Sequence, residues 1–275
     1  RGSLEWEDFE NMKLPIPHPD KQCEIVKEYN VIQNRITLNL QLIQKLEETA
    51  QATYKQWFVD FEFPEPLTPK GEKYIGYKSS GGEMVWCEEL GKEIPKGWKK
   101  CILKEISNCL DYKRRPLSEE ERNEFKGKFP YFGAMGIVDY VKEYIFDGEY
   151  LLFSEDGVNV IDEKGHPAVF IIWGKLWVNN HAHILVGKDG FSTRLIYSML
   201  KDVNVSDLVT GAAQPKINQE NMNSIILIKP NISVSTAFDK IINPMFEIIK
   251  NKTIENQKLT ELKELLLSKL ATIEN

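Results

Sequence analysis

A run of basic residues close to aromatic ones is the first part of this 275-residue chain that could do chemistry. Lys113, Arg114 and Arg115 are consecutive, and two further lysines lead into Tyr131 and Phe132. Cations for phosphates and guanine edges, with aromatic residues between them, are the ingredients of a nucleic-acid-binding surface. Four glutamates within residues 119–124 could neutralise these charges, so a solvated loop without a binding role stays equally open.

Amide and imidazole side chains follow in segments typical of turns. Such groups can hydrogen-bond to adenine or guanine edges, although Asn and Gln more often cap turns. The candidate nucleic-acid contacts are therefore Lys113, Arg114, Arg115, Lys126, Lys128, Tyr131, Asn159, Asn180, His181, Gln214 and Lys216.

Motifs for catalysis are missing from the sequence: it has neither a phosphate-binding glycine loop, nor a nucleophile elbow, nor the tetrapeptide of a DNA methyltransferase. Asp147 precedes Asp162-Glu163-Lys164 in a layout that resembles a magnesium-dependent nuclease, but charged turns produce the same spacing. His181 and His183 could share one strand face and bind a transition metal, yet further ligands are too few. We therefore expect structural or DNA-contacting histidines, and neither catalytic residues, a metal nor a cofactor on this chain.

Two long helices must flank the segment that carries these groups. Residues 20–62 contain almost exclusively helix-compatible types, and residues 233–275 repeat the pattern, although Pro244 could kink the second helix. Residues 44–48 even align with residues 257–261, which indicates an internal repeat. Apolar positions alternate four and three residues apart, the spacing of a coiled-coil seam. The seam residues are Ile25, Tyr29, Ile32, Ile36, Asn39, Ile43, Leu46, Ala50, Thr53 and Trp57 in the first helix, and Phe238, Ile242, Met245, Ile249, Lys252, Asn256, Leu259, Lys263, Leu266 and Leu270 in the second.

The segment between the helices has a different pattern. Residues 63–92 are rich in Pro and Gly and predict an irregular connector, whereas residues 93–232 contain short apolar runs broken by Gly, Asp and Asn. These runs predict strands of a mixed α+β, sheet-rich domain with one short helix at 192–200. The expected strands cover residues 150–153, 168–173, 183–186 and 224–228.

Charge and hydropathy limit the possible functions. The net charge is −6, with 35 Lys+Arg against 41 Asp+Glu, so nucleic acid must be bound by a local surface rather than by bulk charge. The longest apolar runs are too short to span a membrane, and we find no signal-peptide pattern. A soluble cytoplasmic protein is expected, with its four cysteines as reduced thiols.

Several segments together resemble the specificity (S) subunit of type I restriction-modification enzymes. Residues 14–63 resemble its central helical spacer, and Ile94-Pro95-Lys96-Gly97-Trp98 resembles the lead-in to its second target recognition domain. Within that domain the similar motifs are Tyr131-Phe132-Gly133-Ala134, Glu155-Asp156-Gly157, Trp177-Val178-Asn179-Asn180-His181-Ala182-His183 and Thr210-Gly211-Ala212-Ala213-Gln214-Pro215-Lys216.

The resemblance implies one target recognition domain flanked by two spacer helices that pack as an antiparallel coiled coil, with residues 1–19 as the tail of a preceding recognition domain. It implies that the chain recognises one half of a bipartite double-stranded DNA target. S-adenosylmethionine, ATP and magnesium would then belong to the methylation (M) and restriction (R) subunits. A native half-length chain could form a homodimer. Apolar residues off the seam would dock the methylation subunits: Leu42, Phe58, Leu262 and Leu265.

Two alternatives of other classes stay open. The chain could be a coiled-coil interaction module whose central domain binds protein and not DNA. It could also be a metal-dependent nuclease that uses Asp162, although the chemistry above favours this less.

Overall fold

The computed structural model describes residues 6, 10, 18–64, 76–157, 160–211 and 214–271, with side chains up to residue 268. The chain forms two compact units, one of residues 1–46 and 247–275 and one of residues 47–246. Both long helices contribute to both units. None of the helices in the described ranges is long and apolar enough to cross a membrane.

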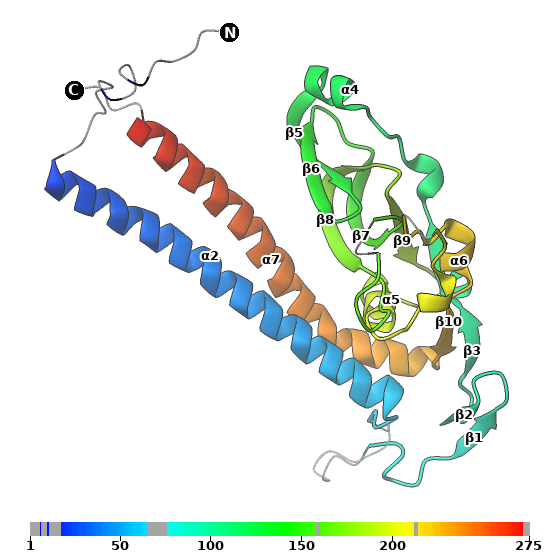
Figure 1. Ribbon diagram of the computed structural model, residues 1–275. Helices are drawn as coiled ribbons and strands as arrows, with labels where there is room; N and C mark the ends of the chain where they lie inside the picture. Colours follow the sequence, from blue (N-terminus) through cyan, green and yellow to red (C-terminus); the bar gives the residue numbers. More distant parts are fainter. Residues whose placement is uncertain are drawn as a thin grey trace. The chain divides into compact units, whose positions relative to one another are not determined.

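The first unit is a pair of helices, formed by parts of α2 (Pro19–Tyr54) and α7 (Ile232–Ala271). Two contacts between them join a later position in α2 to an earlier one in α7: Gln33 Oε1 accepts from Lys263 Nζ at 3.1 Å, and Asn39 Nδ2 donates to Asn256 Oδ1 at 2.8 Å. Arg35 Nε also contacts Glu255 Oε1 at 2.6 Å. The helices are therefore antiparallel neighbours, as predicted (Figure 1).

The predicted seam is confirmed on both helices. Every seam residue whose side chain is described is buried or half-buried, while several apolar residues off the seam, such as Val31, Leu38 and Leu262, are exposed. Helix α2 begins at Pro19, which suits the first helical position because its missing N–H would have no partner there. Helix α7 continues through Pro244.

The second unit contains a six-stranded sheet in the order β4-β9-β7-β8-β5-β6, in which only the β5–β8 pair is parallel. Two smaller sheets pair β1 with β2 and β10 with β3. The predicted strands all occur, with somewhat different bounds. The strands are β1 (Met84–Cys87), β2 (Lys92–Pro95), β3 (Lys99–Ile102), β4 (Ser107–Cys109), β5 (Lys126–Gly133), β6 (Gly136–Val141), β7 (Phe146–Ser154), β8 (Val169–Val178), β9 (Ala182–Gly187) and β10 (Ile226–Lys229).

Short helices complete this unit, and α5 (Thr193–Leu200), predicted at 192–200, packs against β7, β8 and β9 (Figure 1). Almost all of α5 is buried because the ends of the long helices cover its other side: Gln51 donates to the Ser198 carbonyl, and Tyr197 packs edge-on against Phe246. The remaining short helices are α3 (Leu103–Ile106), α4 (Glu119–Glu124) and α6 (Gln219–Asn223), the 3-10 turns η2 (Asp111–Lys113) and η3 (Ser206–Leu208), and the π-helical turn η1 (Lys55–Val59).

Phe58 corrects one prediction. It was expected to lie off the seam and to dock another protein, but it is only 3% exposed. Its ring packs against Trp98 at 5.6 Å and edge-on against Phe238 at 5.0 Å, centroid to centroid. Its π-helical turn shifts the side-chain phase relative to an α-helix, so the four-and-three spacing no longer predicts its direction. Phe58 therefore belongs to the core that joins the helix ends to the domain.

The predicted connector is partly regular. Strands β1 and β2 form an antiparallel hairpin that begins inside residues 63–92, with Met84 opposite Pro95. Residues 65–75 lie outside the described residues.

Candidate nucleic-acid interface

A buried cluster of charged side chains lies at one end of the six-stranded sheet. Asp111 in η2 contacts Nδ1 of His183 in β9 at 2.5 Å and Nη2 of Arg114 at 2.9 Å, and it accepts a hydrogen bond from the Ile184 N–H at 3.0 Å. Nη1 of Arg114 donates to Glu155 at 2.9 Å. We call Asp111, Arg114, Glu155 and His183 the charged cluster.

Every group of the charged cluster has partners. The Arg114 guanidinium also donates to the Ala182 carbonyl at 2.7 Å, and Nε2 of His183 lies 2.9 Å from the Ile217 carbonyl oxygen. Both ring nitrogens of His183 therefore face oxygen atoms. Removing one member would leave the others buried with fewer partners, which is costly.

The charged cluster holds four loops together. Glu155 follows β7 directly; its N–H donates to the His181 carbonyl and its carbonyl accepts from the Ile217 N–H, both at 2.9 Å. Gly157 N–H donates to the Pro215 carbonyl at 3.2 Å. The loops around residues 111–114, 155–157, 179–181 and 214–217 therefore meet at one place.

Ion pairing keeps the buried carboxyls charged. Burial by itself would raise the pKa of Asp111, but the hydrogen bond and charge of His183, the Ile184 N–H and Arg114 outweigh it and lower that pKa. Burial likewise opposes the lowered pKa of Glu155, which the hydrogen bonds from Lys216 and Arg114 bring below its usual range. The bond to Glu155 in turn raises the pKa of Lys216.

Cys109 lies beside this cluster, and its sulfur, an Asp111 oxygen and a His183 nitrogen lie within 4.8 Å of one another. Three such ligands could in principle bind a metal ion. Burial and the charge of Asp111 raise the pKa of the Cys109 thiol to about 12. Because Asp111 already forms an ion pair with Arg114, this group of side chains does not suit a further cation.

Exposed polar groups surround the charged cluster on three of the four loops. His181 is 48% exposed in its side chain, and Asp156 holds its Nδ1 at 2.9 Å. The Lys216 ammonium contacts Glu155 at 2.8 Å and is 45% exposed, and Asn180 and Gln214 are exposed as well. Lys113 extends from η2 with its ammonium 5.6 Å from the centre of the Tyr112 ring. The name loop surface is used below for six residues: Tyr112, Lys113, Asn180, His181, Gln214 and Lys216.

Tyr112 is the residue that sequence reasoning missed. It is 76% exposed, the largest fraction of any large apolar or aromatic residue in the described part of the chain. The sequence does indicate Tyr112 as a candidate contact, because this residue directly precedes the basic run at 113–115.

Two predicted contacts have internal roles instead. The Arg114 side chain is only 13% exposed, because Asp111 and Glu155 bind it from inside the domain. Tyr131 is 1% exposed, and its hydroxyl accepts from the Leu117 N–H at 2.9 Å. Both predictions are therefore corrected: Arg114 and Tyr131 position loops and do not face a ligand. Asn159 lies outside the described residues.

Lys126 and Lys128 lie elsewhere on the domain. They begin β5, whose other end at Gly133 approaches Asn179, so a strand rise of about 3.3 Å per residue puts roughly 20 Å between Lys126 and that end. The Lys126 ammonium is bound by Asp139 at 2.6 Å, and the Lys128 ammonium lies 5.4 Å from the Phe129 ring centre. The structure does not bring these lysines to the loop surface.

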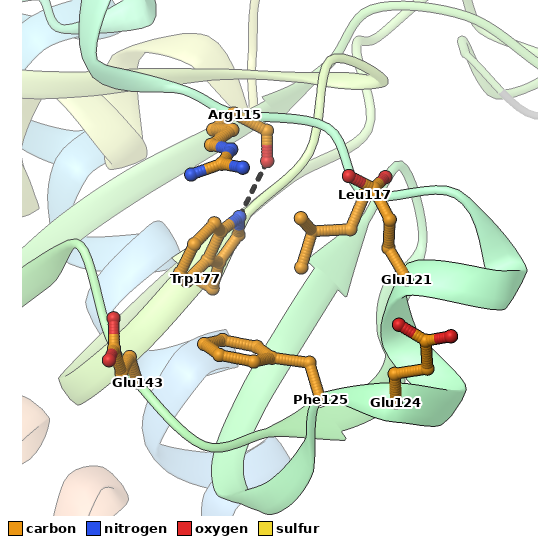
Figure 2. A pocket seen from close by; sticks show the side chains of 7 residues that line it. All are labelled: Arg115, Leu117, Glu121, Glu124, Phe125, Glu143 and Trp177. Atoms are coloured by element: carbon orange, nitrogen blue, oxygen red, sulfur yellow. Dashed lines mark hydrogen bonds between the residues drawn. The ribbon is translucent and has the colours of Figure 1, made fainter.

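Arg115 lies at the edge of a pocket of about 370 Å³, where its carbonyl accepts from Trp177 Nε1 at 2.6 Å (Figure 2). Leu117, Phe125 and Trp177 form its apolar part, and Glu121, Glu124 and Glu143 also line it. Hydrogen bonds from Ser118, with a smaller contribution from Arg115, lower the pKa of Glu121. Three carboxylates against one guanidinium make this pocket unsuitable for phosphate groups.

Of the acidic residues in the nuclease-like pattern, Asp162 stabilises a turn. Oδ1 of Asp162 accepts from the N–H groups of Lys164 at 2.8 Å and His166 at 2.9 Å, and Asp147 lies on β7 opposite Lys175. These contacts favour the solvated turn over a magnesium site.

Apolar side chains off the helical seam remain exposed. Leu42 on α2 and Leu262 and Leu265 on α7 are 40–51% exposed, and they share the two helices with Val31, Leu38 and Leu40. A groove of about 560 Å³ between the helices is lined by Val31, Ile32, Leu262 and Leu266. Exposed apolar surface of this extent is typical of a protein-binding site.

The fold and the loop surface belong to a known class of protein. Residues 95–265 match the type I restriction modification DNA specificity domain, so the chain belongs to that family.

Similar proteins carry the same description. The chain is 32% identical over 157 residues to the putative type I restriction enzyme specificity subunit S.HindORF215P of Haemophilus influenzae, covering 56% of this chain and 38% of that protein. It is 23% identical to the type I restriction enzyme MjaIX specificity subunit of Methanocaldococcus jannaschii, covering 97% of this chain and 61% of the relative. The chain thus spans less than two thirds of either relative.

A crystal structure of a type I restriction-modification system S subunit from M. genitalium has the same fold. The TM-score is 0.56 at 16% identity, over 99% of this chain and 66% of that one. A sheet-rich domain flanked by long helices is therefore the shared architecture.

Proposed function

We propose that this chain is a specificity subunit that recognises one half of a bipartite DNA target through the loop surface. Family membership supports this function, and the arrangement of the loop surface carries it: exposed cationic, imidazole and amide groups from three of the four loops lie around one charged cluster. Lysines there suit phosphates, whereas Asn180, His181 and Gln214 suit base edges.

The helix pair has a separate role in this proposal. Leu42, Leu262 and Leu265 dock methylation subunits, because they expose apolar surface that the seam does not use. The antiparallel pair also acts as the spacer that sets the distance between two half-sites.

Chemistry is left to the partners. The chain is non-catalytic and holds no cofactor of its own, while S-adenosylmethionine acts on the methylation subunits and ATP and magnesium act with the restriction subunits. The assembly is cytoplasmic. A second recognition domain comes from a longer chain or from a homodimer.

Methylome sequencing of cells that carry the intact system tests the recognition role. We expect a bipartite methyladenine motif that disappears when this chain is deleted. Purified chain plus methylation subunit should then shift a duplex containing that motif and not a scrambled duplex. Loss of the chain without loss of the motif contradicts the proposal and favours an interaction module without DNA binding.

Co-purification with the methylation subunit tests the docking role. Leu262→Asp/Leu265→Asp should abolish the complex, whereas the exposed control Asn251→Asp should not. If both variants co-purify equally well with the methylation subunit, α7 is not part of the docking surface.

A further inference from the structure

Tyr112 combines a highly exposed ring with a fixed backbone. An aromatic ring that is 76% exposed gains nothing from the core of its own domain. Its neighbours in η2 are nevertheless among the most firmly held groups of the second unit.

The backbone of Tyr112 is fixed from both sides. Asp111 before it is bound by His183, Arg114 and the Ile184 N–H. After it, the Lys113 N–H donates to the Leu110 carbonyl at 2.9 Å and the Arg114 N–H donates to the Asp111 carbonyl at 3.0 Å. Because this backbone is already ordered, little conformational entropy is lost when a ligand contacts the ring, and this favours binding.

Two lysines lie on the same loop surface as the ring. The Lys113 ammonium is 5.6 Å from the ring centre, and the Lys216 ammonium contacts Glu155 of the charged cluster at 2.8 Å. Aromatic rings beside lysines suit a ligand with flat apolar faces linked by phosphates. Tyr144, also beside a lysine, is different because its ring packs against Phe129 at 5.0 Å.

We propose that Tyr112 stacks on a base of the target duplex by entering a base step, and that the phosphates on either side meet Lys113 and Lys216. This inference rests on the proposed DNA-binding function. Apolar or aromatic wedges of this kind partly unstack a step and kink the duplex, so sequences with easily unstacked steps are favoured at that position. Tyr112 is thus a specificity-determining residue that forms no base-edge hydrogen bond.

Duplex binding by the complex of this chain with its methylation subunit tests the inference. Tyr112→Ala should weaken affinity for the motif duplex roughly ten- to a hundredfold, while Tyr112→Phe keeps it, because stacking does not need the hydroxyl. The control Tyr140→Ala removes another exposed ring, on β6, and should leave affinity unchanged. Duplexes carrying 2-aminopurine at each motif position in turn should brighten at one position with the wild-type complex and not with Tyr112→Ala.

Three results overturn the inference alone: Tyr112→Ala that binds like wild type, Tyr112→Phe that loses as much as Tyr112→Ala, and Tyr112→Ala that instead releases the methylation subunit. A wild-type complex that fails to bind the motif duplex overturns the proposed function together with this inference. Thermal unfolding should be equal for all variants, since neither tyrosine is part of the core.

Discussion

The two units bury polar groups in opposite ways. In the second unit, Asp111, Arg114, Glu155 and His183 are charged or titratable, and each has partners. In the helix pair, Asn39 and Asn256 meet through one neutral hydrogen bond of 2.8 Å, and Nδ2 of Asn256 is buried with no hydrogen-bond partner in the part of the chain that the structure describes.

The two regions need polar contacts of different kinds. The charged cluster fixes four loops in three dimensions, so it requires many directional contacts and forms one connected set. The asparagine pair only has to favour one register of two long helices, which a single polar pair in an apolar seam can do at a cost in stability. Removing charge should therefore damage the domain, and removing the amides should stabilise the helices.

The largest expected effect comes from Asp111→Ala. It leaves His183 and Arg114 buried with fewer partners, so the free energy of unfolding should fall by about 3 kcal/mol or more. Urea unfolding measures this, with exposed Asp207→Ala as the control that should change it by less than about 0.5 kcal/mol. Equal effects would mean that the charged cluster does not hold the domain.

Acid should weaken the same cluster. The pKa values of Asp111 and Glu155 are lowered by folding, so their contribution is present above about pH 4 and is lost as pH falls from there through the folded pKa values. Glu155→Gln should flatten this loss in a series of unfolding curves between neutral and acidic pH. The exposed control Glu220→Gln should keep the wild-type slope. A slope that Glu155→Gln leaves unchanged would exclude Glu155 as a cause.

The helix pair should respond in the opposite direction. Asn39→Leu/Asn256→Leu removes an unsatisfied buried amide and should raise stability by about 1–2 kcal/mol. The register should become less specific, seen as a lower disulfide yield between Arg35→Cys and Glu255→Cys. The exposed pair Asn34→Leu/Asn251→Leu is the control and should change neither quantity. A destabilised double variant would show that the amides stabilise the seam.

The smallest effect should come from Arg35→Ala. Its 2.6 Å pair with Glu255 lowers the pKa of that carboxyl to about 2, chiefly through the hydrogen bond from Arg35, but both groups are exposed to solvent. Exposed ion pairs contribute little to stability because water and salt screen them. Thermal unfolding should not change beyond its own scatter, and a clear drop would make this pair a second determinant of the helix pairing.

The sequence predicted the helices better than the sheet. The seam residues of each long helix could be predicted because their spacing is visible within one continuous segment. The apolar strands β7 to β10 could be predicted from local apolar runs. The hairpin of β1 and β2 and the parallel partner of β5 depend on pairing across the chain, and β5 begins with Lys126-Gly127-Lys128, which does not resemble a strand. Local pattern carries no information on such partners.

For the candidate site, residue types were predictable and directions were not. Arg114 is turned inward by Glu155, which lies 41 residues later, and His183 is bound by Asp111 across 72 residues. His181 and Lys216 are exposed because neighbouring loops take the buried positions. Tyr112 could have been included, since it adjoins the basic run, but its exposure follows only from the fixed turn around it.

The salt dependence of duplex affinity tests the central claim, that the charged cluster presents a DNA-binding surface at one end of the sheet. The complex with the methylation subunit is measured with two matched variants, Lys113→Gln/Lys216→Gln on the loop surface and Lys126→Gln/Lys128→Gln at the far end of β5. Each phosphate contact contributes about 0.9 to the slope of log affinity against log salt, so the first variant should lower that slope by about 2 and the second should leave it unchanged. The reverse result, a slope lowered only by the second variant, would contradict the account.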